Sequence, residues 1–380
     1  MRKNTSILKK IKLCDAVFSV FLIFYIPAFA NGIEKENDKI WHLLELGKLQ
    51  MEKGEFGEAL NYVNLARDIH KRHIESDYEY LFKALKPKQV KRAGDNIFDV
   101  YSVLKEREDH DACAILDTIF LNHPPVFFDK SISKLMAWFE KRSAFPETDF
   151  LTGQIYSAEG EYSQALYYLK KAWDYRLFLE IPDARFDIIY ALADTSRLLH
   201  NYDEQEKYLL LVLTEDSVYG TTNSESATLQ AMIKTLKNEK SAEKFFLLYR
   251  HHNSIALKAY IDLTGIYLQA GNNERALATA ALAASIVITN LDDAVSKTDF
   301  NYGYENFSAL LYKLNRKEEI LAWAEKQRFW EAILNLADTL AANKYEEQAA
   351  DLYQKIAESL PSIKYAQEAV YKKAALKGSF

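Results

Sequence analysis

The sequence predicts an all-α protein built from stacked helical hairpins, and three observations support this. First, Gly153, Gly160, Ala165 and Ala172 follow one another at intervals of seven, five and seven residues, a spacing that recurs elsewhere in the chain. Second, the 380 residues include only 12 glycines and 7 prolines, with almost no strand-like alternation, which leaves little room for a sheet. Third, this length exceeds the usual size of one compact core, which favours two domains or an elongated repeat array.

Residues 1–30 have the pattern of a signal peptide. Five cations lie among the first twelve residues, and an apolar run extends from Val17 to Ala30. Ala28 and Ala30 supply the small side chains that signal peptidase needs, so we expect cleavage between Ala30 and Asn31. The run is shorter than the roughly 20 residues of a membrane-spanning helix, which makes a retained anchor the weaker alternative. We therefore expect a periplasmic or secreted mature protein that does not span a membrane.

The mature chain, which is expected to begin with a short linker at 31–37, is acidic. Removal of the signal peptide leaves 43 Lys and Arg against 53 Asp and Glu, so the formal charge moves from −6 to −10. Affinity for nucleic acid depends on cations that neutralise phosphates, so we expect no nucleic-acid partner. Cys113 is the one cysteine left, which excludes an intramolecular disulfide. Its apolar helical surroundings indicate a small buried side chain rather than a reactive thiol.

Two further segments repeat the spacing of small residues. They are Gly47, Gly54, Ala59 and Ala66 in one segment, and Thr264, Gly271, Ala276 and Ala283 in the other. Each copy indicates two amphipathic helices joined by a tight turn. The second small residue, such as Gly160, stands where the first helix must stop, a position that favours the left-handed conformation of glycine. The other small residues let the two helix axes approach to the short end of the usual range of about 8–10 Å.

This pattern resembles the tetratricopeptide repeat, a 34-residue helix–turn–helix unit whose copies stack into a right-handed superhelical α-solenoid. The resemblance is strong at 40–73, 146–179 and 257–290, and weaker at 186–219, 301–334 and 330–363. In the weaker copies Gln205 and Ile320 replace a small residue of the second helix, so looser packing is expected there.

The solenoid is expected to cover 38–377. Degenerate hairpins are expected at 75–142 and 226–250, and a capping helix at 363–377. Segments 215–227 and 296–307 are expected to be loops, which are either plain surface or partner contacts.

The resemblance implies a non-enzymatic protein-interaction scaffold of the bacterial cell envelope, without a cofactor. Members of that family hold a polypeptide in the concave groove formed by the first helix of each unit. The matching positions here are Lys48, Met51, Phe150, Gln154, Ser157, Tyr190, Asp194, Arg197, Ile261, Leu268, Gln269, Tyr312 and Lys313. Tyr190, Asp194 and Arg197 are expected to form one cluster that grips the partner, and an intramolecular Asp194–Arg197 ion pair is the alternative.

The sequence contains no phosphate-binding glycine loop, nucleophile elbow or His-Glu-x-x-His motif, which argues against an enzyme. His70 and His73 stand one helical turn apart and could share a metal ion, but a solvated helix end is the better interpretation, so no metal site is expected. Two other functions stay open. One is an accessory domain of a cell-wall enzyme, and the other is a small-ligand carrier associated with a transport complex.

Overall fold

The computed structural model describes residues 33–77, 144–221, 224–299, 301–359 and 363–377, together with four isolated positions between 105 and 114. The regular secondary structure of these residues is helical apart from one antiparallel pair of two-residue strands, so the all-α prediction is confirmed. The signal peptide and its cleavage site lie outside the described residues. So does nearly all of the segment 75–142, where degenerate hairpins were expected.

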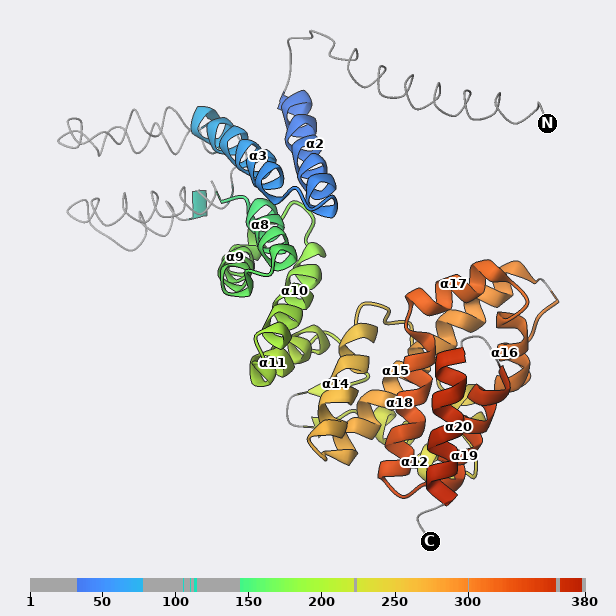
Figure 1. Cartoon of the computed structure of the whole chain (residues 1–380). Helices are drawn as coiled ribbons and strands as arrows, with labels where there is room; N and C mark the ends of the chain where they lie inside the picture. The colour runs from blue at the N-terminus through green and yellow to red at the C-terminus, as the bar shows by residue number, and fades with distance from the viewer. Residues whose placement is uncertain are drawn as a thin grey trace, which may run out of the picture.

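Three hairpins form an N-terminal arm (Figure 1). They are α2 (Ile33–Glu52) with α3 (Phe56–Asp77), α8 (Pro146–Glu159) with α9 (Tyr162–Asp174), and α10 (Ala184–Leu198) with α11 (Tyr202–Leu213). A short 3₁₀ helix, η3 (Arg176–Phe178), follows α9. The second hairpin stacks on the first because α3 packs against α8, although residues 78–145 separate the two helices in the chain. The helix α2 already begins at Ile33, so the linker expected at 31–37 is mostly helix.

The remaining helices form a C-terminal lobe (Figure 1). They are α12 (Ala227–Asn238), α13 (Glu243–Leu248), α14 (Leu257–Gln269), α15 (Asn273–Thr298), α16 (Phe307–Leu314), α17 (Glu318–Lys326), α18 (Phe329–Ala342), α19 (Glu346–Ser359) and α20 (Ile363–Lys377). The pair α14–α15 continues the stack through contacts between α11 and α14, and α18 then packs directly on α14 and α15. The helices α12, α16 and α17 also contact α15. The lobe is therefore more compact than a strictly linear stack.

The turns between paired helices contain residues in the left-handed conformation. Gly54, Gly160 and Gly271 have φ values of 81°, 92° and 71°, in the left-handed region. The fifteenth residue of two weaker copies takes the same conformation without being glycine: His200 has φ 57° and Lys344 has φ 67°. Since a side chain disfavours this conformation, these two turns carry a small strain that the glycine turns avoid.

In the hairpins α2–α3 and α8–α9, small residues lie where the two helices pack against each other. A β-carbon built on Gly153 would stand 2.7 Å from Cγ of Leu169 and 3.2 Å from the carbonyl oxygen of Ala165. Ala165 is itself fully buried. In the weaker copies, the larger side chains of Gln205 and Ile320 are buried at the corresponding position. Within the described residues, Oε1 of Gln205 has no hydrogen-bond partner there, which is unfavourable for a buried amide.

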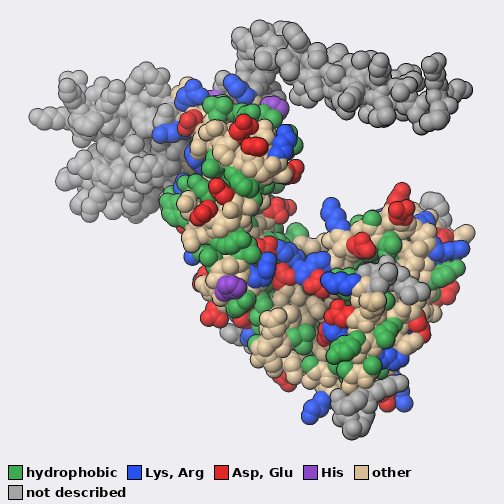
Figure 2. Space-filling view, viewed as in Figure 1, with side chains coloured by type: hydrophobic (Ala, Val, Ile, Leu, Met, Phe, Trp, Pro, Cys, Tyr) green, Lys and Arg blue, Asp and Glu red, His purple; other side chains and the backbone are tan. Residues whose placement is uncertain are grey.

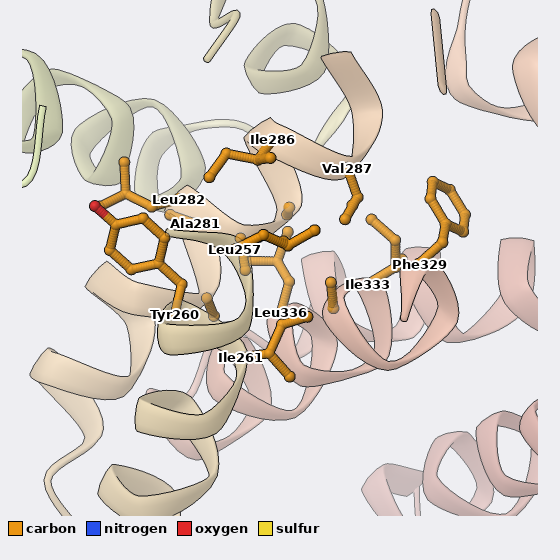
Figure 3. Packing of buried hydrophobic residues seen from close by; sticks show 14 of the residues in the cluster. Leu257, Tyr260, Ile261, Ala281, Leu282, Ile286, Val287, Phe329, Ile333 and Leu336 are labelled. Atoms are coloured by element: carbon orange, nitrogen blue, oxygen red, sulfur yellow. The ribbon is translucent and has the colours of Figure 1, made fainter. Parts of the chain in front are cut away.

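The core is centred on α15. Leu257 and Ile261 of α14 meet Ile286 of α15 and Ile333 and Leu336 of α18 (Figure 3). Within the described residues, α15 is the one helix long and apolar enough to cross a membrane, and 78% of its apolar window is buried inside the protein. This degree of burial is typical of the central helix of a packed core.

Both segments that were expected to be loops contain regular secondary structure. In the segment 296–307, α15 extends to Thr298 because Leu291 and Val295 are buried, and the Tyr302 hydroxyl donates to Asp292 at 2.7 Å. The first helix of the copy at 301–334 is consequently short, because it begins only at Phe307.

In the segment 215–227, β1 (Gly220–Thr221) pairs with β2 (Ser224–Glu225). The Ser226 hydroxyl caps α12 by accepting from the Leu229 amide at 3.1 Å. The segment that follows contains α12 and α13, which form a hairpin within the expected range 226–250.

Candidate partner-binding groove

A groove of about 470 Å³ lies along the first helices of the three N-terminal hairpins. Because α2, α8 and α10 occupy equivalent places in the stack, side chains from corresponding positions meet on one face. The lining consists of Lys48, Met51, Glu52, Phe150, Gln154, Asp187, Tyr190, Ala191 and Asp194. Six of these are residues that the repeat register placed there: Lys48, Met51, Phe150, Gln154, Tyr190 and Asp194.

The groove also contains residues that the sequence analysis did not select. Glu52 follows Met51 directly, and Ala191 follows Tyr190. Asp187 lies three residues before Tyr190 on α10, so the two share one face of the helix. Helical spacing from Tyr190 therefore contained the signal for Asp187, and only adjacency could have indicated the other two.

The remaining candidates do not join this groove. Ile261 is 1% exposed and packs against the lobe core, so its assignment to a binding surface is wrong. The reason is that α18 folds back onto α14 and covers that face. The other candidates lie at half-buried or exposed positions outside the lining: Ser157, Arg197, Leu268, Gln269, Tyr312 and Lys313.

Some charged side chains of the groove have ion-pair partners and others do not. Lys48 forms an exposed ion pair with Glu45 at 2.7 Å, which contributes little to stability. Glu52 and Asp187 are exposed, and neither has an ion-pair partner among the described residues. Two carboxylates are thus available beside the apolar surface of Met51 and Phe150.

Asp194 forms an ion pair with Lys258, at the start of α14, where the carboxylate lies 2.5 Å from Nζ. The alternative of an Asp194–Arg197 pair is therefore wrong. The expected cluster of Tyr190, Asp194 and Arg197 is incomplete, because Arg197 lies outside the groove lining. The Lys258 ammonium lies 4.9 Å from the centre of the Tyr190 ring. Figure 2 shows acidic and basic side chains close together where the arm joins the lobe. Arg328 adds to this region by bridging Asp262 of α14 and Glu331 of α18, with closest N–O distances of 2.6 Å.

Tyr190 connects the groove to the lobe. Its hydroxyl donates to the carbonyl oxygen of Ile255 and accepts from the amide of Ala259 at 3.3 Å. Burial raises the pKa of this phenol, because it disfavours the charged phenolate. The ring therefore faces the groove while the hydroxyl holds the start of α14.

A second polar cluster is closed to solvent and is centred on Asp216. Its carboxylate accepts from Nε2 of His251 at 2.9 Å, from the side-chain amide of Asn253 at 2.9 Å and from the Tyr260 hydroxyl at 2.7 Å. Burial alone would raise the pKa of Asp216, but the hydrogen bonds from His251 and Tyr260 lower it to about 2. The carboxylate joins the 215–227 segment to α14 and is too enclosed to meet a substrate.

Two other chemistries considered from the sequence were a metal site at His70 and His73 and a reactive thiol at Cys113. Within the described ranges, no three His, Cys, Asp or Glu side chains are placed to hold a metal ion together. His70 stacks on Phe145 with ring centres 4.4 Å apart, so it helps to pack α3 against the start of α8. Cys113 is half-buried.

Comparison with known proteins identifies a relative of this chain. An uncharacterised protein from Treponema pallidum (strain Nichols) is 41% identical over 345 residues, which cover 90% of this chain and 92% of the relative. The chain belongs to the same family. No protein-family model matches the sequence.

Two solved structures are distant matches to this chain. The TPR domain of P58(IPK) is 13% identical, with coverage of 90% of this chain and 98% of that chain, at a TM-score of 0.19. Yeast Tom70 is 12% identical, with coverage of 90% and 96%, at a TM-score of 0.16. Superpositions this poor add nothing to the helical architecture already described.

Proposed function

We propose that this protein is an exported, non-enzymatic scaffold of the bacterial cell envelope that holds a partner polypeptide in the groove of α2, α8 and α10. The observation that carries the proposal is the convergence of six repeat-register positions, from three separate helices, on one open groove. A groove formed by equivalent helices of stacked hairpins offers an extended surface, which suits an extended chain better than a compact ligand.

The lining also indicates the chemistry of the partner. Met51, Phe150 and the Tyr190 ring supply apolar and aromatic surface, while the carboxylates of Glu52 and Asp187 lack cationic partners among the described residues. A segment that alternates apolar side chains with Lys or Arg would fit this lining. Its apolar side chains would be buried against the apolar surface, and its cations would pair with the two carboxylates. We therefore expect the partner segment to be basic and partly apolar.

Site-specific photo-crosslinking tests the groove. A photoreactive amino acid at Gln154, which lies in the groove, should crosslink one partner protein, whereas the same residue at Lys170, exposed on α9, should not. Asp187→Lys should abolish that crosslink, because it replaces an attractive charge with a repulsive one. Asp203→Lys is the matched control, since Asp203 is an exposed acid in the first turn of α11, as Asp187 is in α10. Equal crosslinking in the Asp187→Lys variant would contradict the proposal.

Export is tested separately, on the natively produced protein. The mature chain should begin at Asn31, because the apolar run is short and ends in Ala28-Phe29-Ala30. Intact-mass measurement of the protein recovered from the envelope fraction checks this. A mass that still includes residues 1–30 would indicate an anchored protein.

A further inference from the structure

A second cavity, of about 580 Å³, lies between the end of α9, the start of α10 and the end of α11. Its apolar walls come from Trp173, Leu179, Phe186, Ile189 and Leu211. Its volume is in the range of ordinary ligand sites, but it contains two arginines and one carboxylate, which gives it a distinct charge pattern. We call it the Trp173 pocket.

The Trp173 pocket and the groove use different faces of α10. The groove takes residues 187, 190, 191 and 194, which recur at helical spacing on one face. The pocket takes residues 185, 186 and 189, which lie roughly 140° around the helix from the first set. The pocket is therefore a separate surface from the proposed groove, on the other side of the helix that both share.

One of the two arginines is neutralised and the other is not. Nη2 of Arg185 donates to both carboxylate oxygens of Glu215 at 3.0 Å, so that charge is paired. The Arg176 guanidinium lies 4.2 Å from the centre of the Trp173 ring and donates Nη1 to the Trp173 carbonyl oxygen at 3.0 Å. Among the described residues no carboxylate is within ion-pair distance of Arg176. Arg176 thus places a positive charge at an apolar cavity, and its guanidinium has further N–H donors that can bind a ligand.

Apolar surface continues beyond the cavity. Leu177, at its rim, is 86% exposed, and Ile181 in the same connection is 58% exposed. Single exposed apolar residues need no explanation, but two of them beside an apolar cavity extend it into a larger patch. A small molecule that filled the cavity would leave this patch uncovered, whereas a polypeptide could cover both.

We propose that the Trp173 pocket binds a partner polypeptide at a segment in which an apolar side chain neighbours a carboxylate. The apolar side chain enters the cavity and contacts Trp173 and Phe186. The carboxylate pairs with the planar guanidinium of Arg176, whose fork suits two-point binding of a carboxylate. Arginine and tryptophan are among the residues that dominate binding energy at protein interfaces.

A peptide array tests this with the mature chain. Its members place Leu, Ile, Phe or Trp next to Asp or Glu in an otherwise neutral sequence, and matched members carry Asn or Gln, or Lys, in place of the acid. Members with the carboxylate should bind, and Arg176→Gln should weaken their binding by about tenfold or more, as expected for loss of a charged pair. Arg197→Gln is the matched control, because Arg197 is an exposed arginine of α10 outside the pocket. Leu177→Ser should also weaken binding without harming folding, because this side chain is almost fully exposed.

Several results would overturn the proposal. They are an array without bound members, equal binding of the neutral or Lys-containing members, and unchanged binding by the Arg176→Gln variant. A change of peptide binding in either direction in the Asp187→Lys variant would place the peptide in the groove instead. Displacement of the peptides by sodium oleate at equal concentration would identify the pocket as a fatty-acid site.

Discussion

Gly153 of α8 packs directly against Leu169 of α9, since a β-carbon on Gly153 would stand 2.7 Å from Leu169 Cγ. Real β-carbons essentially never come so near another heavy atom, so any larger residue must push Leu169 away or separate the helices. Leu169 is fully buried, which leaves it no free space to move into. The close packing of α8 against α9 therefore requires a residue without a side chain at position 153.

Gly153→Ala should therefore destabilise the protein, by about 1–3 kcal/mol, as is usual for overpacking. Gly265→Ala is the control, because a β-carbon on this helical glycine of α14 would meet no atom within 4 Å. That variant should gain up to about 1 kcal/mol from the better helix propensity of alanine. Thermal unfolding of both variants measures the difference, and a stabilised Gly153→Ala variant would show that α8 and α9 do not cross there.

The left-handed turns predict opposite effects at two equivalent positions. Lys344→Gly should stabilise the protein by about 0.5 kcal/mol, because relief of left-handed strain exceeds the extra flexibility of an unfolded glycine. Gly160→Ala should destabilise it by about 1 kcal/mol, although no atom would crowd the new side chain. Urea unfolding measures both. A change of the same sign in the two variants would rule out a shared turn conformation.

Asp216 predicts a component of acid sensitivity. Its pKa falls from 3.8 to about 2 on folding, so the folded state binds its proton less readily than the unfolded state. This carboxylate therefore contributes stability, on the order of 2 kcal/mol, that is fully present above about pH 5 and lost as the pH falls through 2. Asp216→Asn should lower stability at pH 7 and flatten the decline between pH 5 and 2. Asp293→Asn, at an exposed position, should leave both unchanged. Parallel loss with pH in wild type and Asp216→Asn would contradict the assignment.

Tyr190→Phe should separate the two roles of this side chain. Removal of the hydroxyl leaves the Ile255 carbonyl and the Ala259 amide without their partner, which should cost about 0.5–1.5 kcal/mol. The ring stays in place, so the groove crosslink from position 154 should persist. Chemical denaturation and the crosslinking assay check the two parts. A variant that keeps full stability would mean that the hydroxyl does not hold α14.

Local spacing explains which features could be predicted from the sequence. The turn at Gly160 and the crossing at Ala165 depend on residues a few positions apart, so repeat spacing alone locates them. The tether from Tyr190 to Ile255 and the network around Asp216 join residues that are 65 and 35 or more positions apart. Neither the repeat spacing nor the helical periodicity of the sequence predicts such contacts. Ile261 was misplaced for the same reason, because the helix that covers it, α18, comes much later in the chain.

The position of α10 between two surfaces has a consequence for stoichiometry. A helix with its side chains is about 10–12 Å across, so ligands on its two faces could be bound together without touching each other. A ternary complex would then keep its outer members at a fixed separation, set by one rigid element rather than by their own affinity. If occupancy of one face tilted α10, the affinity at the other face would change by the same factor in both directions, as linkage requires. Titration of one ligand in the presence and absence of the other would measure that factor directly.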